Sequence, residues 1–126
     1  MTRIDAPSPA DGTFLATTAI VDGIVTATLV GEAGIQAQGA IGAFLGELHG
    51  FAVESRAARV DVDLREVEFM NSTCLKEMVR WLNRVVGNLG APRYAVRLVG
   101  SSAVHWQRRS LYALQCFAPD VVEVQV

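Results

Sequence analysis

Hydrophobic and polar residues alternate in the middle of the chain and predict a β-strand that leads into a helix. Val60, Val62 and Leu64 alternate with Asp61 and Asp63, which is the two-residue period of a strand. From residue 75 the hydrophobic period becomes that of a helix, and we expect one buried face made of Leu75, Met78, Val79, Leu82, Val86 and Leu89. The other predicted elements are arranged around this strand and helix.

A short segment joins the predicted strand to the predicted helix. A turn is expected at residues 65–66, and a hydrophobic pair follows at residues 69–70. Residues 71–73, with the sequence Asn-Ser-Thr, are three helix-capping types in a row. Because unpaired N–H groups and the helix dipole favour an anion at such a place, a phosphoryl group on either hydroxyl would be well tolerated.

The remaining patterns predict a mixed sheet with helices packed on it. Asp22 and Gly23 are a strong hairpin signal between two strands, Ser102 is the expected N-cap of the last helix, and Pro119 ends it. We expect further strands at residues 14–21, 24–30, 94–99 and 121–126, and further helices at residues 35–53 and about 102–117. Helices between strands imply parallel pairing, whereas the opening hairpin is antiparallel. The prediction is an α/β domain with a four- to five-stranded sheet over residues 13–126, after a flexible tail at residues 1–12.

The segment at residues 63–75 resembles the signature of STAS domains, the family of sulfate-transporter tails and anti-sigma factor antagonists. In the antagonists the signature runs Asp/Asn-Leu, a short turn, a hydrophobic pair and then Asp-Ser-Ser-Gly-Leu. Its first serine, the phosphorylated residue in many antagonists, falls on Ser72, and Thr73 takes the second hydroxyl position. Asn71 and Cys74 stand where the family usually has Asp and Gly. The order of predicted elements is also the STAS order.

The resemblance implies a phosphorylation-regulated switch for protein–protein interaction. The phosphoacceptor would be Ser72, with Thr73 as the alternative, and the partners an anti-sigma factor or serine kinase and a phosphatase. The implied partner-binding residues are Phe69, Met70, Asn71, Ser72, Thr73, Cys74, Lys76, Glu77, Arg80 and Trp81. One alternative is a STAS accessory or scaffold subunit of a lipid transporter or a stressosome-like assembly. A less favoured one is a small thiol enzyme that uses Cys74.

Several residues have both a structural and a functional interpretation. Glycines 42, 46 and 50 recur at four-residue spacing in a helix, which is explained by close packing on a neighbouring element or, less favoured, by a flat surface for another chain. Trp81 has arginines beside it in the sequence and lies off the predicted apolar stripe, so it is either an interface anchor or an ordinary boundary residue. The same two interpretations apply to Trp106 and Tyr112. Cys74 is favoured as a buried structural thiol, and Asp63 as a structural residue of the turn.

Composition narrows the function classes. In 126 residues, 51% are hydrophobic and 19% charged, which indicates one globular domain. The net charge of −2 argues against a nucleic-acid surface, and no run is apolar enough for a membrane span or, at residues 1–12, for a signal peptide. Two cysteines without metal-ligand spacing suggest free thiols in the cytoplasm. We expect no catalytic residue, no metal and no cofactor, and a homodimer stays open.

Overall fold

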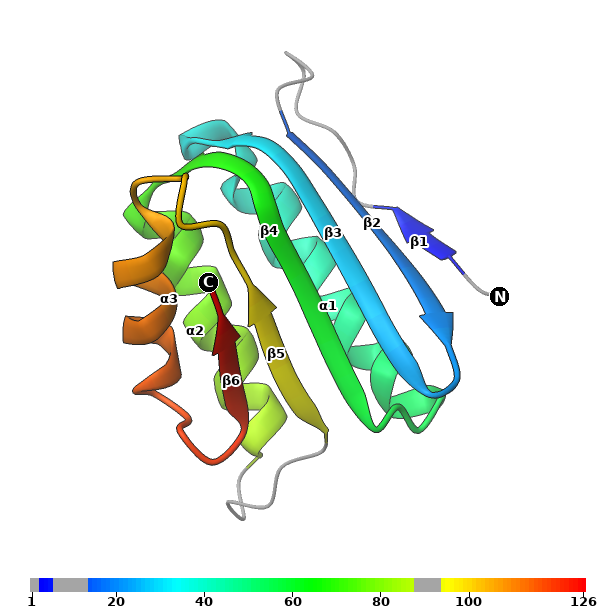
Figure 1. The fold of residues 1–126 in the computed structure, drawn as a ribbon. Helices are drawn as coiled ribbons and strands as arrows, with labels where there is room; N and C mark the ends of the chain where they lie inside the picture. The colour runs from blue at the N-terminus through cyan, green and yellow to red at the C-terminus, as the bar shows by residue number, and fades with distance from the viewer. Residues whose placement is uncertain (1–2, 6–13, 88–93) are drawn as a thin grey trace.

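The computed structural model describes residues 3–5, 14–87 and 94–126. Its sheet has six strands in the sequential order β1-β2-β3-β4-β5-β6 (Figure 1). The first two pairings are antiparallel and the other three parallel, which confirms the predicted mixed sheet. The strands are β1 (Arg3–Asp5), β2 (Phe14–Val21), β3 (Ile24–Ala33), β4 (Arg59–Met70), β5 (Ala95–Val99) and β6 (Val122–Gln125).

Strand β1 is one strand more than the sequence predicted. It lies within residues 1–12, which we expected to be a flexible tail, and it pairs with residues 17–19 of β2. For residues 3–5 the tail prediction is therefore wrong, and the rest of that segment lies outside the described residues. Three residues carry too short a pattern for a strand to be recognised, and β1 forms because the edge of β2 offers it hydrogen-bonding partners.

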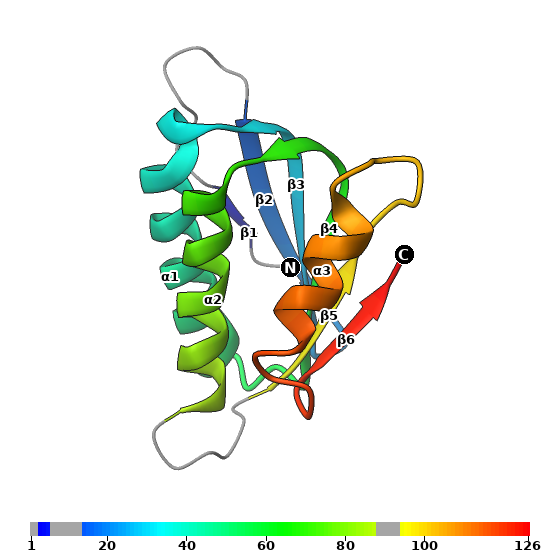
Figure 2. The same ribbon diagram turned by 90° about the vertical axis from the view of Figure 1, so that its left-hand side faces the viewer.

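The helices all lie on one face of the sheet (Figure 2). They are the 3₁₀ turn η1 (Ile35–Ala37), α1 (Gln38–Glu54), α2 (Ser72–Val86) and α3 (Gln107–Gln115). Each helix joins two neighbouring parallel strands, and the strand order advances in one direction. Right-handed crossovers must therefore place every helix on the same side. None of the described helices is both long and apolar enough to cross a membrane.

The buried core lies between the sheet and these helices. Val60, Val62 and Leu64 are fully buried, as their alternation predicted. They face side chains such as Phe44 and Leu48 of α1, which belong to the same core cluster. This arrangement makes β4 the central strand, and its C-terminal end leads directly into α2.

Strand β4 is longer and less regular than predicted. It continues for 12 residues, so the turn expected at residues 65–66 is wrong. Its pairing with β3 instead shifts register twice, between Thr28 and Val30 and between Gly31 and Glu32. Residues 65–66 and 68–69 are adjacent exposed pairs, because a β-bulge breaks the strict alternation of a strand. Residues 31–33 lie between the strand predicted at residues 24–30 and the helix predicted at residues 35–53, and they extend β3 to meet this longer β4.

The amide of Gln107 fastens this irregular part of β4 to α3. Gln107 is fully buried and donates hydrogen bonds to the carbonyl oxygens of Leu64 and Val67, at 2.9 Å for Val67. The indole Nε1 of Trp106 donates to the same Val67 oxygen at 3.0 Å. A bulged strand leaves carbonyl groups without ladder partners, and burying them unpaired would be costly. The N-cap and the first residue of α3 therefore stabilise the strand that leads into α2.

The last helix begins later and ends earlier than predicted. Its N-cap is Trp106, without a side-chain cap, so the assignment of Ser102 as N-cap is wrong. The hydroxyl of Ser101 accepts a bond from the Ala103 N–H at 3.2 Å, which favours a local turn over a helix start. We also expected Val104, Leu111, Leu114 and Phe117 to form the inner face of this helix. Leu111 and Leu114 are buried and Val104 is half-buried, but Phe117 lies beyond the end of α3 and is 60% exposed.

The α1 glycines face α2 at one end of the helix. A Cβ atom at Gly42 would lie 2.7 Å from the Glu77 carboxylate, and one at Gly46 would lie 3.5 Å from Arg84 Nη1. A Cβ at Gly50 would meet nothing within 4 Å. Close helix packing therefore explains Gly42, as the favoured interpretation stated, whereas Gly50 stands in open space.

Candidate phosphorylation and partner-binding site

Asn71 starts helix α2 and leaves Ser72 as its first helical residue. The backbone of Asn71 is extended, and its Oδ1 accepts the Cys74 N–H at 3.0 Å. This is the geometry of an N-cap. Of the three capping types in the sequence, the structure uses the first, so Ser72 does not serve as the cap.

The two hydroxyl groups that follow differ in their availability. Thr73 is half-buried, and its Oγ1 donates to Asn71 Oδ1 at 2.8 Å. Ser72 is exposed, and its hydroxyl makes no hydrogen bond within the described residues. The first turn of α2 holds no acidic residue that would repel an anion. Of the two, Ser72 is the hydroxyl that another protein can reach without first breaking a hydrogen bond.

An apolar groove of about 270 Å³ lies between α2 and α3, which run side by side in Figure 2. Four lining residues come from α2, three from α3 and one from the turn that follows α3: Ser72, Leu75, Lys76, Val79, Ser110, Ala113, Leu114 and Phe117. We call this feature the α2–α3 groove. Ser72 and Lys76 are one helical turn apart on its α2 wall, so the candidate phosphoacceptor opens onto an apolar surface with one positive charge.

The ten residues implied as partner-binding do not form one exposed surface. Phe69, Ser72, Lys76 and Arg80 are exposed, whereas Asn71, Thr73 and Glu77 are half-buried. Met70, Cys74 and Trp81 are buried and lie beneath that surface. The groove residues of α3 were missed, because no sequence pattern indicates which residues of one helix lie beside another.

The prediction that Trp81 lies off the buried stripe of α2 is wrong. Trp81 is 2% exposed, and its Nε1 donates to the hydroxyl of Tyr94 at 2.9 Å. That hydroxyl also lies 2.9 Å from Nδ1 of His49. A polar partner inside the core allows the indole to be buried, which rotates the inner face of α2 toward α1. Leu75, Val79 and Val86 are only partly buried as a result, and Leu89 lies outside the described residues.

Cys74 has the environment of a structural thiol, as favoured from the sequence. Its side chain is fully buried, and its Sγ donates to the Gly34 carbonyl oxygen at 3.5 Å. Burial raises the pKa of the Cys74 thiol, and the negative charge of Glu77 raises it further, although a hydrogen bond with Thr73 acts in the opposite direction. A nucleophilic cysteine needs a lowered pKa and access to substrate. The alternative of a Cys74 thiol enzyme gains no support from this geometry.

The two aspartates of β4 are each paired with an arginine two residues away. Asp61 lies 2.7 Å from Nε of Arg59, and Asp63 lies 2.8 Å from Nη2 of Arg65. Asp63 Oδ1 also accepts the Arg65 backbone N–H at 3.1 Å. The side-chain hydrogen bond from Arg65 holds the pKa of Asp63 below its usual value. Asp63 is thus structural, as interpreted, although it stabilises a bulge rather than a turn.

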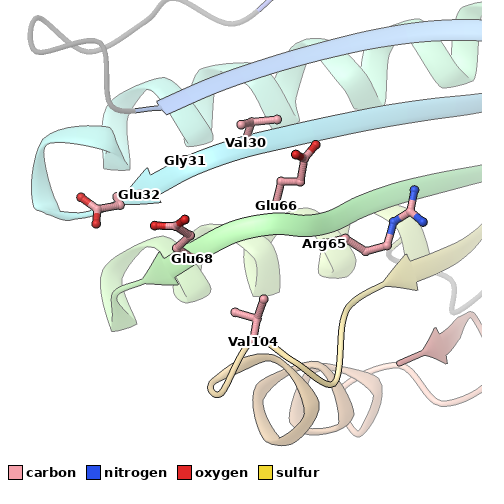
Figure 3. Close-up of a pocket in the computed structure, with 7 residues that line it drawn as sticks. All are labelled: Val30, Gly31, Glu32, Arg65, Glu66, Glu68 and Val104. Carbon is pink, nitrogen blue, oxygen red and sulfur yellow. The ribbon is translucent and has the colours of Figure 1, made fainter.

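A second, acidic depression lies near the C-terminal ends of β3 and β4 (Figure 3). Glu32 comes from β3, Glu66 and Glu68 from β4, and Val104 from the loop before α3. Its volume is about 510 Å³ and it is open to solvent. Among the described residues, no group of three His, Cys, Asp or Glu side chains has an arrangement that could hold a metal ion. No local sequence pattern indicates this depression, because its carboxylates come from two strands whose pairing shifts register.

Comparison with known proteins identifies the fold. No family model matches the chain, and no curated protein matches it either. The crystal structure of an anti-sigma factor antagonist from Mycobacterium paratuberculosis superposes with a TM-score of 0.66 at 18% identity, over 94% of this chain and 90% of that one. The NMR structure of a protein called TM1081 superposes with a TM-score of 0.58 at 21% identity, over 85% of this chain and 77% of that one.

These similarities define the class of the protein as a STAS-like α/β domain. The predicted fold class is therefore confirmed, with the similarity covering nearly the whole chain. At such low sequence identities, structural similarity shows the fold alone, and the function has to be inferred from the site itself.

Proposed function

We propose that this protein is a cytoplasmic, phosphorylation-regulated switch that binds a protein partner, in the manner of an anti-sigma factor antagonist. The partner would be an anti-sigma factor or a serine kinase, with a phosphatase to reset the switch. The observation that carries the proposal is Ser72, at the first position of α2 on the edge of an apolar groove. Its hydroxyl is exposed and makes no hydrogen bond within the described residues. In this proposal the protein acts by binding, and the catalysis belongs to its partners.

The proposed modification is a phosphoryl transfer from a nucleoside triphosphate bound to the kinase. Oγ of Ser72 would attack the γ-phosphorus, the bond to the β-phosphate oxygen would break, and the hydroxyl proton would pass to a base of the kinase. The product carries about −1.5 to −2 charges at neutral pH. The N-terminus of α2 supports that charge through its dipole and N–H groups.

Mass spectrometry of the protein isolated from its own cells tests the modification. Trypsin cuts after Arg65 and Lys76, so the phosphate should appear on the peptide of residues 66–76, at Ser72. Ser72→Ala should abolish the label. Label that persists in Ser72→Ala but disappears in Thr73→Ala would assign the acceptor to Thr73 instead.

A charge substitution tests whether the modification controls binding. Ser72→Asp should retain or slightly raise thermal stability, because a negative charge in the first turn contributes about 0.3–1 kcal/mol. The affinity for the partner that is recovered with the wild-type protein should fall by about tenfold or more, since a buried unpaired charge costs several kcal/mol. Partner binding that Ser72→Asp leaves unchanged would favour the accessory or scaffold subunit, in which the hydroxyl is structural.

A further inference from the structure

We propose that the α2–α3 groove binds an acidic amphipathic helix of the partner protein, and that the charge at Ser72 controls this docking. The inference rests on the proposed function and deepens it by naming the chemistry of the partner segment. Three features of the groove support it: the spacing of its apolar side chains, the charge at Lys76, and the position of Ser72.

The apolar side chains of the groove recur at helical spacing on both walls. Leu75 and Val79 are one turn apart on α2, and Ala113 of α3 lies four residues before Phe117, which follows the end of that helix. Phe117 is 60% exposed, which leaves a large aromatic surface at the rim. Two such rows form a trough that fits the side chains at positions i, i+3, i+4 and i+7 of a third helix. The groove is therefore shaped for the apolar face of an amphipathic helix.

The charge around the groove is basic. Lys76 is the only charged residue among those that line it. Arg108 and Arg109 of α3 do not line the groove, and α3 holds no acidic residue. All three cations are exposed, and none has an ion pair within the described residues. The first acidic residue that follows α3 in the sequence is Asp120, which is exposed.

The acidic side chain closest to Lys76 in sequence points elsewhere. Glu77 faces Gly42 of α1 and pairs with Arg80 at 3.1 Å, and its side chain is 13% exposed. It therefore leaves Lys76 uncompensated on the groove side of α2. Complementary charge across an interface selects partners and speeds their encounter, so the flank of the docking helix should carry Asp and Glu.

Ser72 is placed to regulate this docking by charge. It precedes Lys76 by one helical turn, and both residues line the groove. A negative group at Ser72 would pair with Lys76 and repel an acidic helix at the same point. The same charge would also lie against the apolar surface that the partner must cover. Release by phosphorylation follows from these two effects without any change of fold.

A peptide-display selection on the full-length protein tests the inference. The probe is a library of random peptides of helix-forming composition. The recovered binders should combine hydrophobic residues at i, i+3, i+4 and i+7 with a flank of Asp and Glu. Their dissociation constants, measured by fluorescence anisotropy, should rise about tenfold or more in Ala113→Glu and in Lys76→Glu. Ser72→Asp should weaken the same peptides, and amide chemical shifts should change along α2 and α3.

Ala43→Glu is the matched control, because Ala43 is an exposed alanine of α1 that does not line the groove. Its affinities should stay within about twofold of wild type, as expected for a distant surface change. Thermal unfolding of each variant establishes that lost binding is not lost folding. Ala113 is exposed in the middle of α3, so Ala113→Glu should unfold near the wild-type temperature.

Three kinds of result would overturn the inference. Peptides that are basic or uncharged, or that bind Ala113→Glu as well as wild type, would exclude an acidic helix in this groove. If oleate binds the wild-type protein but not Ala113→Glu, and no selected peptide depends on the groove, then the groove binds a lipid. Self-association that Ala113→Glu abolishes would assign it to a second copy of the chain. Absence of phosphate on Ser72 in cells would instead contradict the proposed function and leave the peptide affinities unchanged, so the two failures are distinguishable.

Discussion

Asn71 and Ser72 are adjacent polar residues with separate roles at the start of α2. The Asn71 side chain caps the helix by accepting the Cys74 N–H, whereas the Ser72 hydroxyl makes no bond within the described residues. Stability and regulation are thus assigned to neighbouring residues, so that a change at Ser72 can alter binding without loosening the helix.

Substitutions at these two positions should separate the two roles. Asn71→Ala should lower the free energy of unfolding by about 1 kcal/mol, the usual loss for an N-cap. Ser72→Ala should change it by less than about 0.5 kcal/mol, as for a surface residue. Urea denaturation measures both. A larger loss in Ser72→Ala than in Asn71→Ala would mean that Ser72 is the cap in solution.

The two cysteines should differ in their reactivity toward iodoacetamide. Cys116 is exposed, whereas Cys74 is buried and its thiol pKa is raised by that burial, which disfavours the reactive thiolate at Cys74. At neutral pH we expect alkylation at Cys116, and at Cys74 only after urea unfolds the chain. Peptide mass spectrometry separates the two sites, with Cys116→Ser as the control. Rapid native labelling of Cys74 would reopen the thiol-enzyme alternative.

At the scale of elements, α1 and α2 form a closely packed pair because Gly42 leaves room for the Glu77 carboxylate. Glu77 is held there by Arg80. This contact draws the charged side of α2 toward α1 and leaves Leu75 and Val79 partly exposed on the other side, toward α3. The packing of α1 against α2 therefore leaves the α2–α3 groove open.

Alanine substitutions at two glycines test that contact. Gly50→Ala should raise the free energy of unfolding by about 0.5–1 kcal/mol, because alanine favours a helix and its Cβ meets no neighbour. Gly42→Ala should gain less or lose stability, since the Glu77 carboxylate must move away from a Cβ only 2.7 Å from it. Urea denaturation compares the two variants. Equal gains would show that the Glu77 side chain moves aside without cost, so that Gly42 is not required for the packing of the two helices.

At the scale of the whole molecule, the helices cover one face of the sheet and its two edges end in the short strands β1 and β6. Strand β1 pairs with only three residues of the eight-residue β2. An edge strand with unpaired N–H and C=O groups invites pairing with another chain. Strand β1 covers part of the β2 edge, and we expect it to hinder pairing between the sheets of separate molecules.

Removal of residues 1–12 tests this contribution. The shortened chain should lose about 1–2 kcal/mol of stability with the hydrogen bonds between β1 and β2. It should also self-associate more at high concentration, because the edge of β2 becomes available. Urea denaturation and analytical ultracentrifugation measure the two effects. A shortened chain with unchanged stability and association would show that β1 contributes to neither.

The sequence by itself determined the order of most elements and the position of the candidate site. Strand β2 has the predicted bounds, and the alternation at residues 60–64 and the polar segment at residues 71–73 located the junction of β4 and α2. These features are local: strand alternation, turn residues and helix caps act over a few positions, so they are readable from neighbouring residues alone.

Only the tertiary structure decided which residues face one another. The bulges of β4 depend on its register with β3 and on the buried amide of Gln107, which is 40 residues from Val67. Trp81 is buried because Tyr94 supplies a hydrogen-bond partner inside the core. The α2–α3 groove likewise exists because two helices distant in sequence pack on the same face of one sheet. Contacts of this kind depend on long-range packing, which no local pattern in the chain encodes.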